Sequence, residues 1–324
     1  MKYVEFLKGE RRVSRLCLGT VNFGTSVKEG LAFDLLDRFI DAGGNFLDTA
    51  NVYGRWEPAW TNASEQVIGR YLKSRGGRDR LVISTKGAHP PIENMSQSRV
   101  SDKEIRNDLE ESLRALGTDY IDCYFLHRDD TSIPVSDILG IMEKLKEEGK
   151  VLHYGCSNWT LRRVMDADAD AMWSHREGFA CNQILLSLAD TNSSGITDKT
   201  MVAMDRKFFD YHSTTGKPVM AYMALAKGYF SKVLHGTPVS DSLKAMYDNR
   251  FNRYVLEHFP SYKKQFGTAS TPIILSYLSS QTFPVVPIAS FSSIDQLNEG
   301  LASCDIDFPT DLRDSLNSMR RFEC

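Results

Sequence analysis

The sequence lacks the features that mark secreted, membrane-spanning and disulfide-linked proteins. Its first residues contain no apolar stretch of the kind found in signal peptides, and no window approaches about 18 uninterrupted apolar residues. The chain has 6 cysteines but no CxxC pair, the spacing that is typical of zinc sites. We therefore expect a cytoplasmic protein with reduced thiols, no metal site and no membrane segment.

The chain also lacks a strong charge of either sign. A net charge of -3 provides no basic surface for nucleic acid or for an anionic membrane. Apolar residues make up 42% of the chain and charged residues 25%, which is ordinary for a globular protein with a large core. Linkers, low-complexity tracts and sequence repeats are missing. We expect a single domain, residues 1–324, and the sequence does not indicate its oligomeric state.

What the chain does contain is a regular alternation of short apolar strands and amphipathic helices. A hairpin turning at 8–10 precedes the first strand, 16–20, and the strands are apolar throughout, so both of their faces should be covered. Eight such strand–helix units predict an α/β fold, a (β/α)8 TIM barrel with an N-terminal β-hairpin and extra C-terminal helical segments. In the second half we expect helix 160–173, strand 178–182, helix 198–215, strand 218–222, a long connection 226–266, helix 268–279, strand 284–287 and helix 293–303.

Two helix starts carry capping signals of different strength. Ser101 precedes Glu104 at the spacing of a capping box, which predicts a helix beginning at that point. The pair Ser64-Glu65 offers a weaker signal at the start of an earlier helix.

Three of the expected strands end in a titratable side chain. One ends at Asp48 and leads into a loop with Tyr53, and later strands stop at Lys86 and His127. Lys86 follows Asp48 by 38 residues and His127 follows Lys86 by 41, about the length of one strand, one helix and two loops. Side chains at the C-terminal strand ends of such a barrel face its active site. We therefore expect these four groups to lie together.

Taken singly, each group has an ordinary explanation: a capping aspartate, a solvated lysine, a structural histidine. Together they suit acid–base chemistry. A phenol has a pKa of about 10 and gives up its proton near neutrality only when its phenolate is stabilised. An ammonium group beside Tyr53 provides that stabilisation, and a carboxylate fixes the ammonium. His127 would then orient a substrate oxygen.

These residues resemble the catalytic tetrad of the aldo-keto reductase superfamily. The similarity runs through nearly the whole chain, and the segment after His127 is closer to the bacterial and potassium-channel beta-subunit branches than to the animal aldose-reductase branch. The matching segments, in chain order, are Asp48-Thr49-Ala50 with Tyr53 beyond it, Ser64-Glu65, Thr85-Lys86, Leu126-His127 and Gly155-Cys156-Ser157-Asn158.

The resemblance implies a barrel that binds NAD(P)H without a Rossmann domain and transfers hydride from the nicotinamide to a carbonyl group. Tyr53 would be the general acid and Lys86 would lower its pKa. Asp48 would pair with Lys86, and His127 would position the carbonyl and assist proton transfer. NADP is the preferred cofactor, with NAD as the alternative.

Cofactor contacts follow from the same resemblance. Ser157, Asn158 and Gln183 match the residues that bind the nicotinamide carboxamide, and Tyr222 matches the ring that stacks on it. Met223-Ala224 stands where the family has Ser-Pro, and the Lys and Arg that clamp a 2′-phosphate in other branches have no counterpart, which leaves Lys227, Arg250 or Arg253 as candidate cations. The remaining expected cofactor residues are Thr20, Leu225, Ser290, Ser292, Gln296 and Glu299.

Aromatic residues near the tetrad are candidates for the substrate pocket, although each has an equal alternative as hydrophobic cover. They are Trp56, Trp60, His89 and Trp159. An aromatic wall with few polar groups suits a small carbonyl compound or a sugar-derived ketone.

Three functions remain open on the sequence alone. The first is an NADPH-dependent carbonyl reductase, and the second is a nicotinamide-binding partner protein with little turnover. The third is a barrel lyase that forms a Schiff base through Lys86, a role open to a desolvated lysine.

Overall fold

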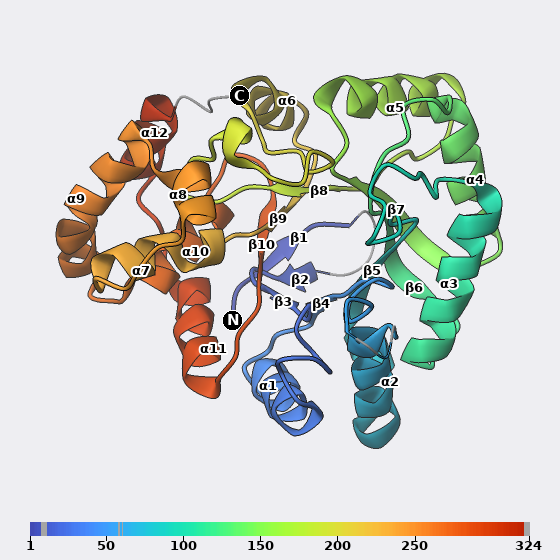
Figure 1. Cartoon of the computed structure of the whole chain (residues 1–324), viewed down its shortest axis with the longest axis horizontal. Helices are drawn as coiled ribbons and strands as arrows, with labels where there is room; N and C mark the ends of the chain where they lie inside the picture. Colours follow the sequence, from blue (N-terminus) through green and yellow to red (C-terminus); the bar gives the residue numbers. More distant parts are fainter. Residues whose placement is uncertain (8–11, 58, 60, 321–324) are drawn as a thin grey trace.

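A closed barrel of parallel strands forms the centre of the molecule, with helices around it (Figure 1). The computed structural model describes residues 1–7, 12–57, 59 and 61–320. Within them the barrel order is β10-β3-β4-β5-β6-β7-β8-β9, which confirms the expected (β/α)8 fold. The strands are β3 (Cys17–Gly19), β4 (Phe46–Asp48), β5 (Val82–Gly87), β6 (Ile121–Leu126), β7 (Val151–Ser157), β8 (Asn182–Leu185), β9 (Val219–Tyr222) and β10 (Val285–Ala289).

A hairpin closes the amino-terminal end of the barrel. Strand β1 (Tyr3–Glu5) pairs antiparallel with β2 (Arg12–Ser14), as predicted, and the predicted turn at 8–10 lies outside the described residues. Phe6, Leu7 and Val13 are buried against the apolar side chains of the barrel interior. The hairpin therefore acts as a plug at this end.

The helices of the βα units cover the outside of the barrel. Ser101 caps α3 by accepting a hydrogen bond from the backbone N–H of Glu104, as predicted. Helix α2 has no side-chain cap, so the expectation that Ser64-Glu65 would cap its start is wrong. These helices are α1 (Glu29–Asp41), α2 (Ala63–Arg75), α3 (Asp102–Leu116), α4 (Val135–Glu147), α5 (Leu161–Trp173), α6 (Arg206–Thr215), α10 (Ser270–Ser279) and α11 (Ile294–Leu301).

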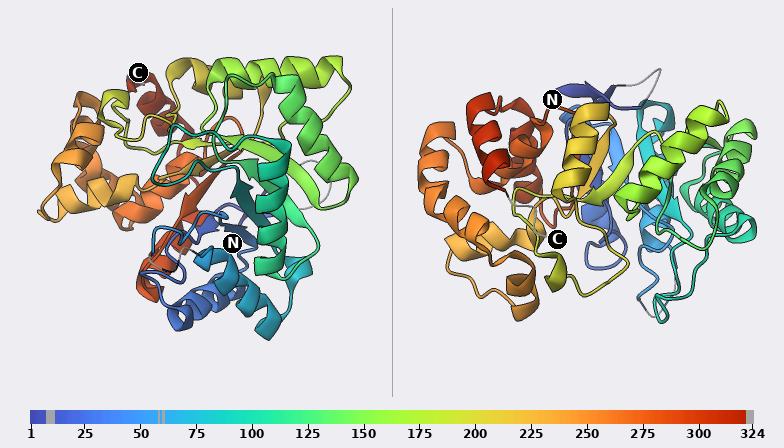
Figure 2. Two further views of the ribbon diagram at one scale, coloured as in Figure 1. Left: turned by 45° about the vertical axis from the view of Figure 1, so that its right-hand side comes forward. Right: turned by 90° about the horizontal axis from the view of Figure 1, so that it is seen from above.

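Two predicted elements begin at least four residues away from their observed starts, and one segment that was expected as a connection is helical. The strand expected at 178–182 begins at Asn182; Phe179 and Cys181, which precede it, are buried although they are not part of the strand. The helix expected from 198 begins at Arg206, where the Asp205 side chain caps it. The long connection is itself helical and groups beside β9 and β10 with a C-terminal helix (Figures 1 and 2). Its helices are α7 (Tyr229–Leu234), α8 (Asp241–Tyr247) and α9 (Arg250–Phe266), and the C-terminal one is α12 (Thr310–Met319).

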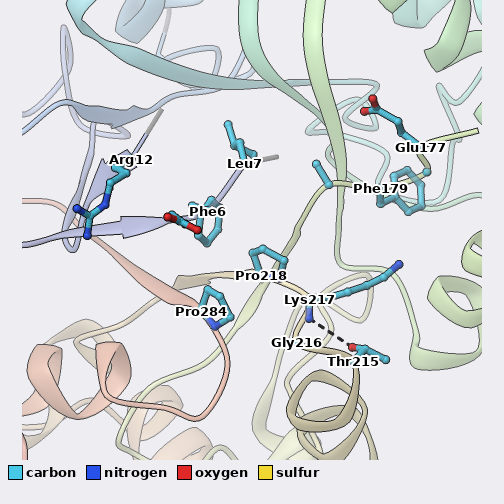
Figure 3. A pocket seen from close by; sticks show the side chains of 13 residues that line it. Phe6, Leu7, Arg12, Glu177, Phe179, Thr215, Gly216, Lys217, Pro218 and Pro284 are labelled. Atoms are coloured by element: carbon cyan, nitrogen blue, oxygen red, sulfur yellow. Dashed lines mark hydrogen bonds between the residues drawn. The ribbon is translucent and has the colours of Figure 1, made fainter. Parts of the chain in front are cut away.

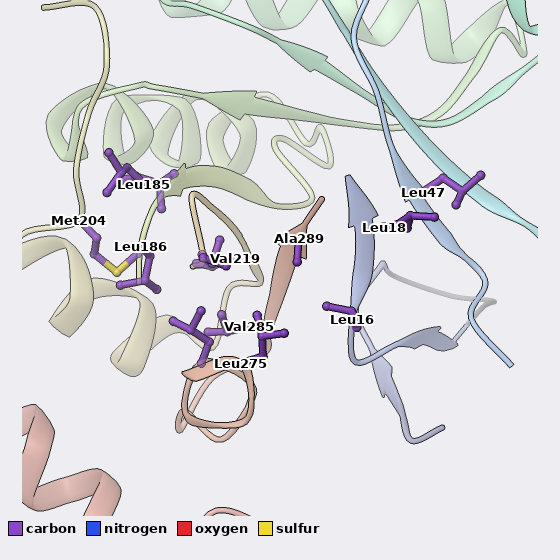
Figure 4. Packing of buried hydrophobic residues seen from close by; sticks show 14 of the residues in the cluster. Leu16, Leu18, Leu47, Leu185, Leu186, Met204, Val219, Leu275, Val285 and Ala289 are labelled. Atoms are coloured by element: carbon purple, nitrogen blue, oxygen red, sulfur yellow. The ribbon is translucent and has the colours of Figure 1, made fainter. Parts of the chain in front are cut away.

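Side chains along several barrel strands alternate between two apolar environments. Leu18, Leu47 and Val219 face outward into the core beneath the helices (Figure 4). Their neighbours Cys17, Phe46 and Met220 belong to a separate cluster inside the barrel. The alternation is hidden in the sequence because both environments are apolar.

A cavity of about 700 Å³ lies at the plugged end (Figure 3). It is bordered by Phe6 and Arg12 of the hairpin and by residues that precede strands, such as Lys217, Pro218 and Pro284. It is therefore at the opposite end from the strand ends that carry Asp48 and Lys86. In the described part of the chain, no helix has the length and apolarity needed to cross a membrane.

Candidate active site

The barrel brings Asp48, Lys86 and Tyr53 into one hydrogen-bonded cluster. The Lys86 ammonium group donates to Asp48 Oδ2 at 2.7 Å, to the Thr49 carbonyl at 2.6 Å and to Tyr53 Oη at 3.2 Å. Three bonds use all three protons of an ammonium group. Since Lys86 donates to the phenol oxygen, the phenolic proton of Tyr53 is free to be donated elsewhere.

Burial and charge set the protonation states of this cluster. Burial lowers the pKa of Lys86, but Asp48 and Tyr53 raise it more, so the pKa lies above its ordinary value and the amine stays charged. Burial raises the pKa of Tyr53, and the Lys86 ammonium opposes this shift without reversing it. The phenol is therefore protonated near neutral pH, as a general acid must be before it reacts.

His127 lies beside the cluster in its neutral form. Its ring is 6.1 Å from the Tyr53 ring and 4.7 Å from the His89 ring, measured between centroids. Burial, together with His89 and the Arg128 guanidinium, holds the pKa of His127 well below its usual range. Its Nδ1 is buried and has no hydrogen-bond partner among the described residues.

His89 is also neutral. Its Nδ1 lies 2.6 Å from the Pro90 carbonyl, which places the ring proton on that nitrogen and leaves Nε2 as an acceptor. Burial lowers the pKa of His89 to about 4, and the charge of Arg128 adds to this effect. His89 borders a cavity of about 230 Å³ that also reaches Lys86.

A larger cavity, of about 440 Å³, opens at the carboxyl ends of β3, β4, β9 and β10. Both Asp48 and Tyr53 border it, so it meets the hydrogen-bonded cluster directly. The expected cofactor residues that border it are Thr20, Tyr222, Leu225 and Ser290, and the candidate cation Lys227 borders it as well.

The residues expected at the nicotinamide carboxamide are engaged with one another. Asn158 donates to Ser157 Oγ at 3.0 Å and accepts from the Tyr222 hydroxyl at 2.6 Å. Gln183 donates to Asp48 Oδ1 at 2.9 Å, so it supports the carboxylate that pairs with Lys86. Its contact with Asp48 was not part of the sequence prediction, and it is explained by β8 placing Gln183 inside the barrel.

The residues expected at the adenosine end lie around the start of α11. Both the hydroxyl and the backbone N–H of Ser292 lie 2.9 Å from Gln296 Oε1, and the Ser293 hydroxyl caps the helix. Glu299 follows on the same helix. None of these side chains borders the 440 Å³ cavity as the described residues define it.

The aromatic candidates for the substrate pocket fall into different places. Trp56 is 45% exposed, and its ring centroid is 6.3 Å from that of Tyr53. Trp159 is fully buried in the core around the barrel, packs against Phe179 at 4.9 Å and borders neither the 230 Å³ nor the 440 Å³ cavity, so its place in the pocket stays a prediction. Trp159 follows the end of β7, and nothing in the sequence near it indicates whether the indole points towards the pocket or into the surrounding core. Trp60 is outside the described residues.

Sequence reasoning missed two contributors to the cluster. Ser84 donates to Asp48 Oδ1 at 2.8 Å, and it lies two residues before Lys86 on the same strand. The period of two along a strand was a signal that could have found it. The Thr49 carbonyl that binds Lys86 carries no such signal, because a backbone group has no sequence identity.

Comparisons with known proteins show what the whole chain is similar to. The chain is 29% identical to the uncharacterized oxidoreductase YrpG of Bacillus subtilis (strain 168), over 98% of this chain and 96% of that protein. It is 28% identical to an aryl-alcohol dehydrogenase [NADP(+)] of Phanerodontia chrysosporium, over 91% and 77% of the two chains.

Among solved structures, the thermostable aldo-keto reductase Tm1743, in complex with the inhibitor epalrestat, shares the fold. The TM-score is 0.73 at 21% identity, over 98% of this chain and 99% of the other. The family model for the aldo/keto reductase family matches residues 15–321. The chain therefore belongs to the aldo/keto reductase family, whose members are oxidoreductases that use nicotinamide cofactors.

Proposed function

We propose that the protein reduces an aldehyde or ketone to an alcohol, with NADPH as the preferred cofactor and NADH as the alternative. One observation carries the proposal. Lys86 donates a hydrogen bond to the Tyr53 oxygen while it is paired with Asp48, which leaves the phenolic proton available to a substrate.

The residues around the 440 Å³ cavity fit a nicotinamide cofactor. They combine an aromatic ring at Tyr222, a hydroxyl group at Ser290 and a cation at Lys227. The hydroxyl of Thr20, which also borders the cavity, is bonded to the Asp48 carbonyl. When bound, a reduced nicotinamide supplies the hydride. Ser292 and Gln296, at the start of α11, are the proposed contacts of a 2′-phosphate. Both donors of Ser292 bond to Gln296 Oε1 in the structure, so the phosphate would have to replace that acceptor.

The protein's own groups then manage the proton. Tyr53 donates its phenolic proton to the carbonyl oxygen as that oxygen gains negative charge. Lys86 stabilises the phenolate that remains, and Asp48 holds the ammonium in place with support from Gln183 and Ser84. The neutral ring of His127, whose centroid lies 6.1 Å from that of Tyr53, orients the carbonyl group.

A test of this function is NADPH oxidation with a panel of aldehydes, ketones and ketoses. Aryl aldehydes belong in the panel because Trp56 lies beside Tyr53 and one relative is an aryl-alcohol dehydrogenase. Cofactor binding without turnover of any carbonyl would favour the partner-protein alternative instead. If neither NADPH nor NADH binds at millimolar concentration, both functions fail.

The third function, a Schiff-base lyase, has little structural support. A lysine attacks a carbonyl only as the neutral amine, whereas Lys86 carries three hydrogen bonds and a raised pKa. Borohydride treatment in the presence of carbonyl compounds should therefore trap no adduct on Lys86.

A further inference from the structure

The first turn of α2 approaches the candidate active site from outside the barrel. Ser64 and Glu65 lie in this turn, and both side chains are fully buried. Since neither caps the helix, their hydrogen bonds are directed to the strand ends instead. A buried polar group is retained where its bonds hold a specific arrangement.

Ser64 ties together the residues around Asp48 and Lys86. The Ser64 hydroxyl donates its proton to the Thr20 carbonyl at 2.8 Å. The Ser64 oxygen also lies 2.8 Å from Thr49 Oγ1, and since the Ser64 proton is already used, Thr49 is the donor in this second bond. The Thr49 carbonyl is one of the three acceptors of the Lys86 ammonium. Through its side chain, Ser64 therefore fixes a residue that binds Lys86 directly.

Ser64 also contacts the loop that carries the phenol. Its backbone N–H donates to the Tyr53 carbonyl at 3.3 Å. Gly54 follows with a φ of +105°, and a Cβ at this position would lie 2.6 Å from Ala63 Cβ and 2.9 Å from Ala63 N. Only glycine lets the helix come this close to the Tyr53 loop.

Glu65 holds the residue that precedes Lys86. Its Oε1 accepts from the Thr85 hydroxyl at 2.6 Å and its Oε2 accepts from Asn62 Nδ2 at 2.8 Å. Burial raises the pKa of Glu65 to about 7, while the hydroxyl groups of Thr85 and Ser112 oppose the shift. From one helical turn, Ser64 and Glu65 therefore form hydrogen bonds to the loop that follows β4 and to β5.

We propose that Ser64 and Glu65 are positioning residues that keep Lys86 within hydrogen-bonding distance of Tyr53. The inference rests on the proposed function, since it assigns these residues to the same proton transfer. Neither side chain bonds to Tyr53 Oη, Lys86 Nζ or the Asp48 carboxylate, so they act through Thr49, Thr85 and the Tyr53 backbone.

The variants Ser64→Ala and Glu65→Gln separate positioning from general stability. Ser64→Ala removes the bonds to Thr20 and Thr49. Glu65→Gln keeps the shape of the side chain but replaces one carboxylate oxygen with an NH2 group. This donor would face either the Thr85 hydroxyl or the Asn62 amide N–H, both of which donate to Glu65 in the wild type. The matched control is Val67→Ala, because Val67 is fully buried on the same helix and belongs to the apolar core.

Two measurements decide the proposal. The first is lysine-selective ¹⁵N NMR on the free protein, where a buried ammonium with three partners should give slowly exchanging protons. We expect this Lys86 signal in the wild type and Val67→Ala, and its loss in Ser64→Ala. The second is single-turnover NADPH oxidation, which should slow about tenfold in both test variants, with cofactor affinity within about twofold of wild type.

The results distinguish a failure of the proposed function from a failure of the positioning role. If no carbonyl compound in the panel supports NADPH oxidation by the wild-type protein, the proposed function is overturned, and the positioning role is overturned with it. If the wild type is active, the positioning role alone is overturned when Ser64→Ala and Glu65→Gln transfer hydride at wild-type rates. The same conclusion follows if Val67→Ala loses as much rate as they do at equal thermal stability.

Discussion

The two ends of the barrel interior are built from the same strands but from opposite kinds of side chain. At the amino-terminal end the inward positions are apolar and the hairpin plugs them. Two residues further along several of these strands, the inward positions are polar. The apolar layer includes Cys17, Phe46, Val82, Cys123, Phe125, Cys181, Met220 and Val286; the polar layer includes Asp48, Ser84, Lys86, His127, Gln183 and Tyr222.

The difference shows what each end contributes. The polar layer buries an ion pair, and burying charge costs stability unless every group is bonded. Here Ser84 and Gln183 donate to Asp48, and Lys86 donates to the Thr49 carbonyl, so these hydrogen bonds offset the cost of burying the two charges. The apolar layer stabilises the barrel that holds this geometry. The 700 Å³ cavity at the apolar end is the larger one, yet it contains none of the four titratable groups.

The largest expected effect is on the polar layer. Lys86→Met removes the ammonium from Tyr53 and leaves the Asp48 carboxylate buried without its partner. We expect hydride transfer to fall by about 10²-fold or more and the free energy of unfolding to fall by about 3–5 kcal/mol. Single-turnover kinetics and urea unfolding measure the two losses. A variant of normal stability would show that the ion pair is not needed to satisfy Asp48.

The matching change in the apolar layer should affect stability alone. Phe6 is 3% exposed and packs against Phe46 at the plugged end, and it lies just after β1, a strand that carries no site residue. Phe6→Ala should lower the free energy of unfolding by about 3 kcal/mol, with turnover per folded molecule unchanged. A comparable loss of turnover below the unfolding temperature would mean that the two ends are coupled.

A histidine near each end makes stability depend on pH. Burial lowers the pKa of both His89, at the polar end, and His212, at the end of α6, to about 4. An unfolded histidine has a pKa of about 6.5, so the unfolded state binds the proton first. The stability is present above about pH 6.5 and is lost as the pH falls toward 4, by at most about 3 kcal/mol for each ring.

Urea midpoints between pH 4 and pH 8 test this dependence. His212→Gln should flatten the curve without changing turnover, whereas His89→Gln should flatten it and also alter turnover, because His89 contacts His127. An unchanged slope in both variants would mean that other groups cause the pH dependence.

The smallest expected effect concerns the rate at which buried thiols are labelled in the native protein compared with the denatured protein. Cys17, Cys123 and Cys181 lie in the apolar layer, and burial raises the pKa of Cys17 and Cys181 well above the usual value. A thiol reacts as the thiolate. We expect no labelling of these three side chains in the native protein and full labelling in denaturant, as read by mass spectrometry. Rapid native labelling would contradict the layered interior.

The sequence predicted the residues at the strand ends better than it predicted the contacts that support them. Asp48, Lys86 and His127 were found because strand ends meet at one rim whatever the details of packing. Gln183, Ser64 and Glu65 were assigned other roles, because their partners come from distant segments and depend on tertiary geometry. The strand β8 was placed four residues early because burial, which the sequence shows, does not determine strand pairing.

The helices α7 to α9 were missed for a related reason. Their segment was expected as a connection, yet Ser240 and Asn249 cap α8 and α9 through side-chain oxygens. These caps are local signals, and a search for them would have found both helices.

The central claim is that Tyr53 gives its proton to the carbonyl oxygen. Its most direct test is single-turnover NADPH oxidation by Tyr53→Phe, with cofactor affinity measured alongside. The substitution keeps the ring and removes only the proton donor, so we expect hydride transfer to slow by about 10²–10⁴-fold with cofactor affinity almost unchanged. Retention of more than about a tenth of the wild-type rate would contradict Tyr53 as the acid and would transfer that role to His127.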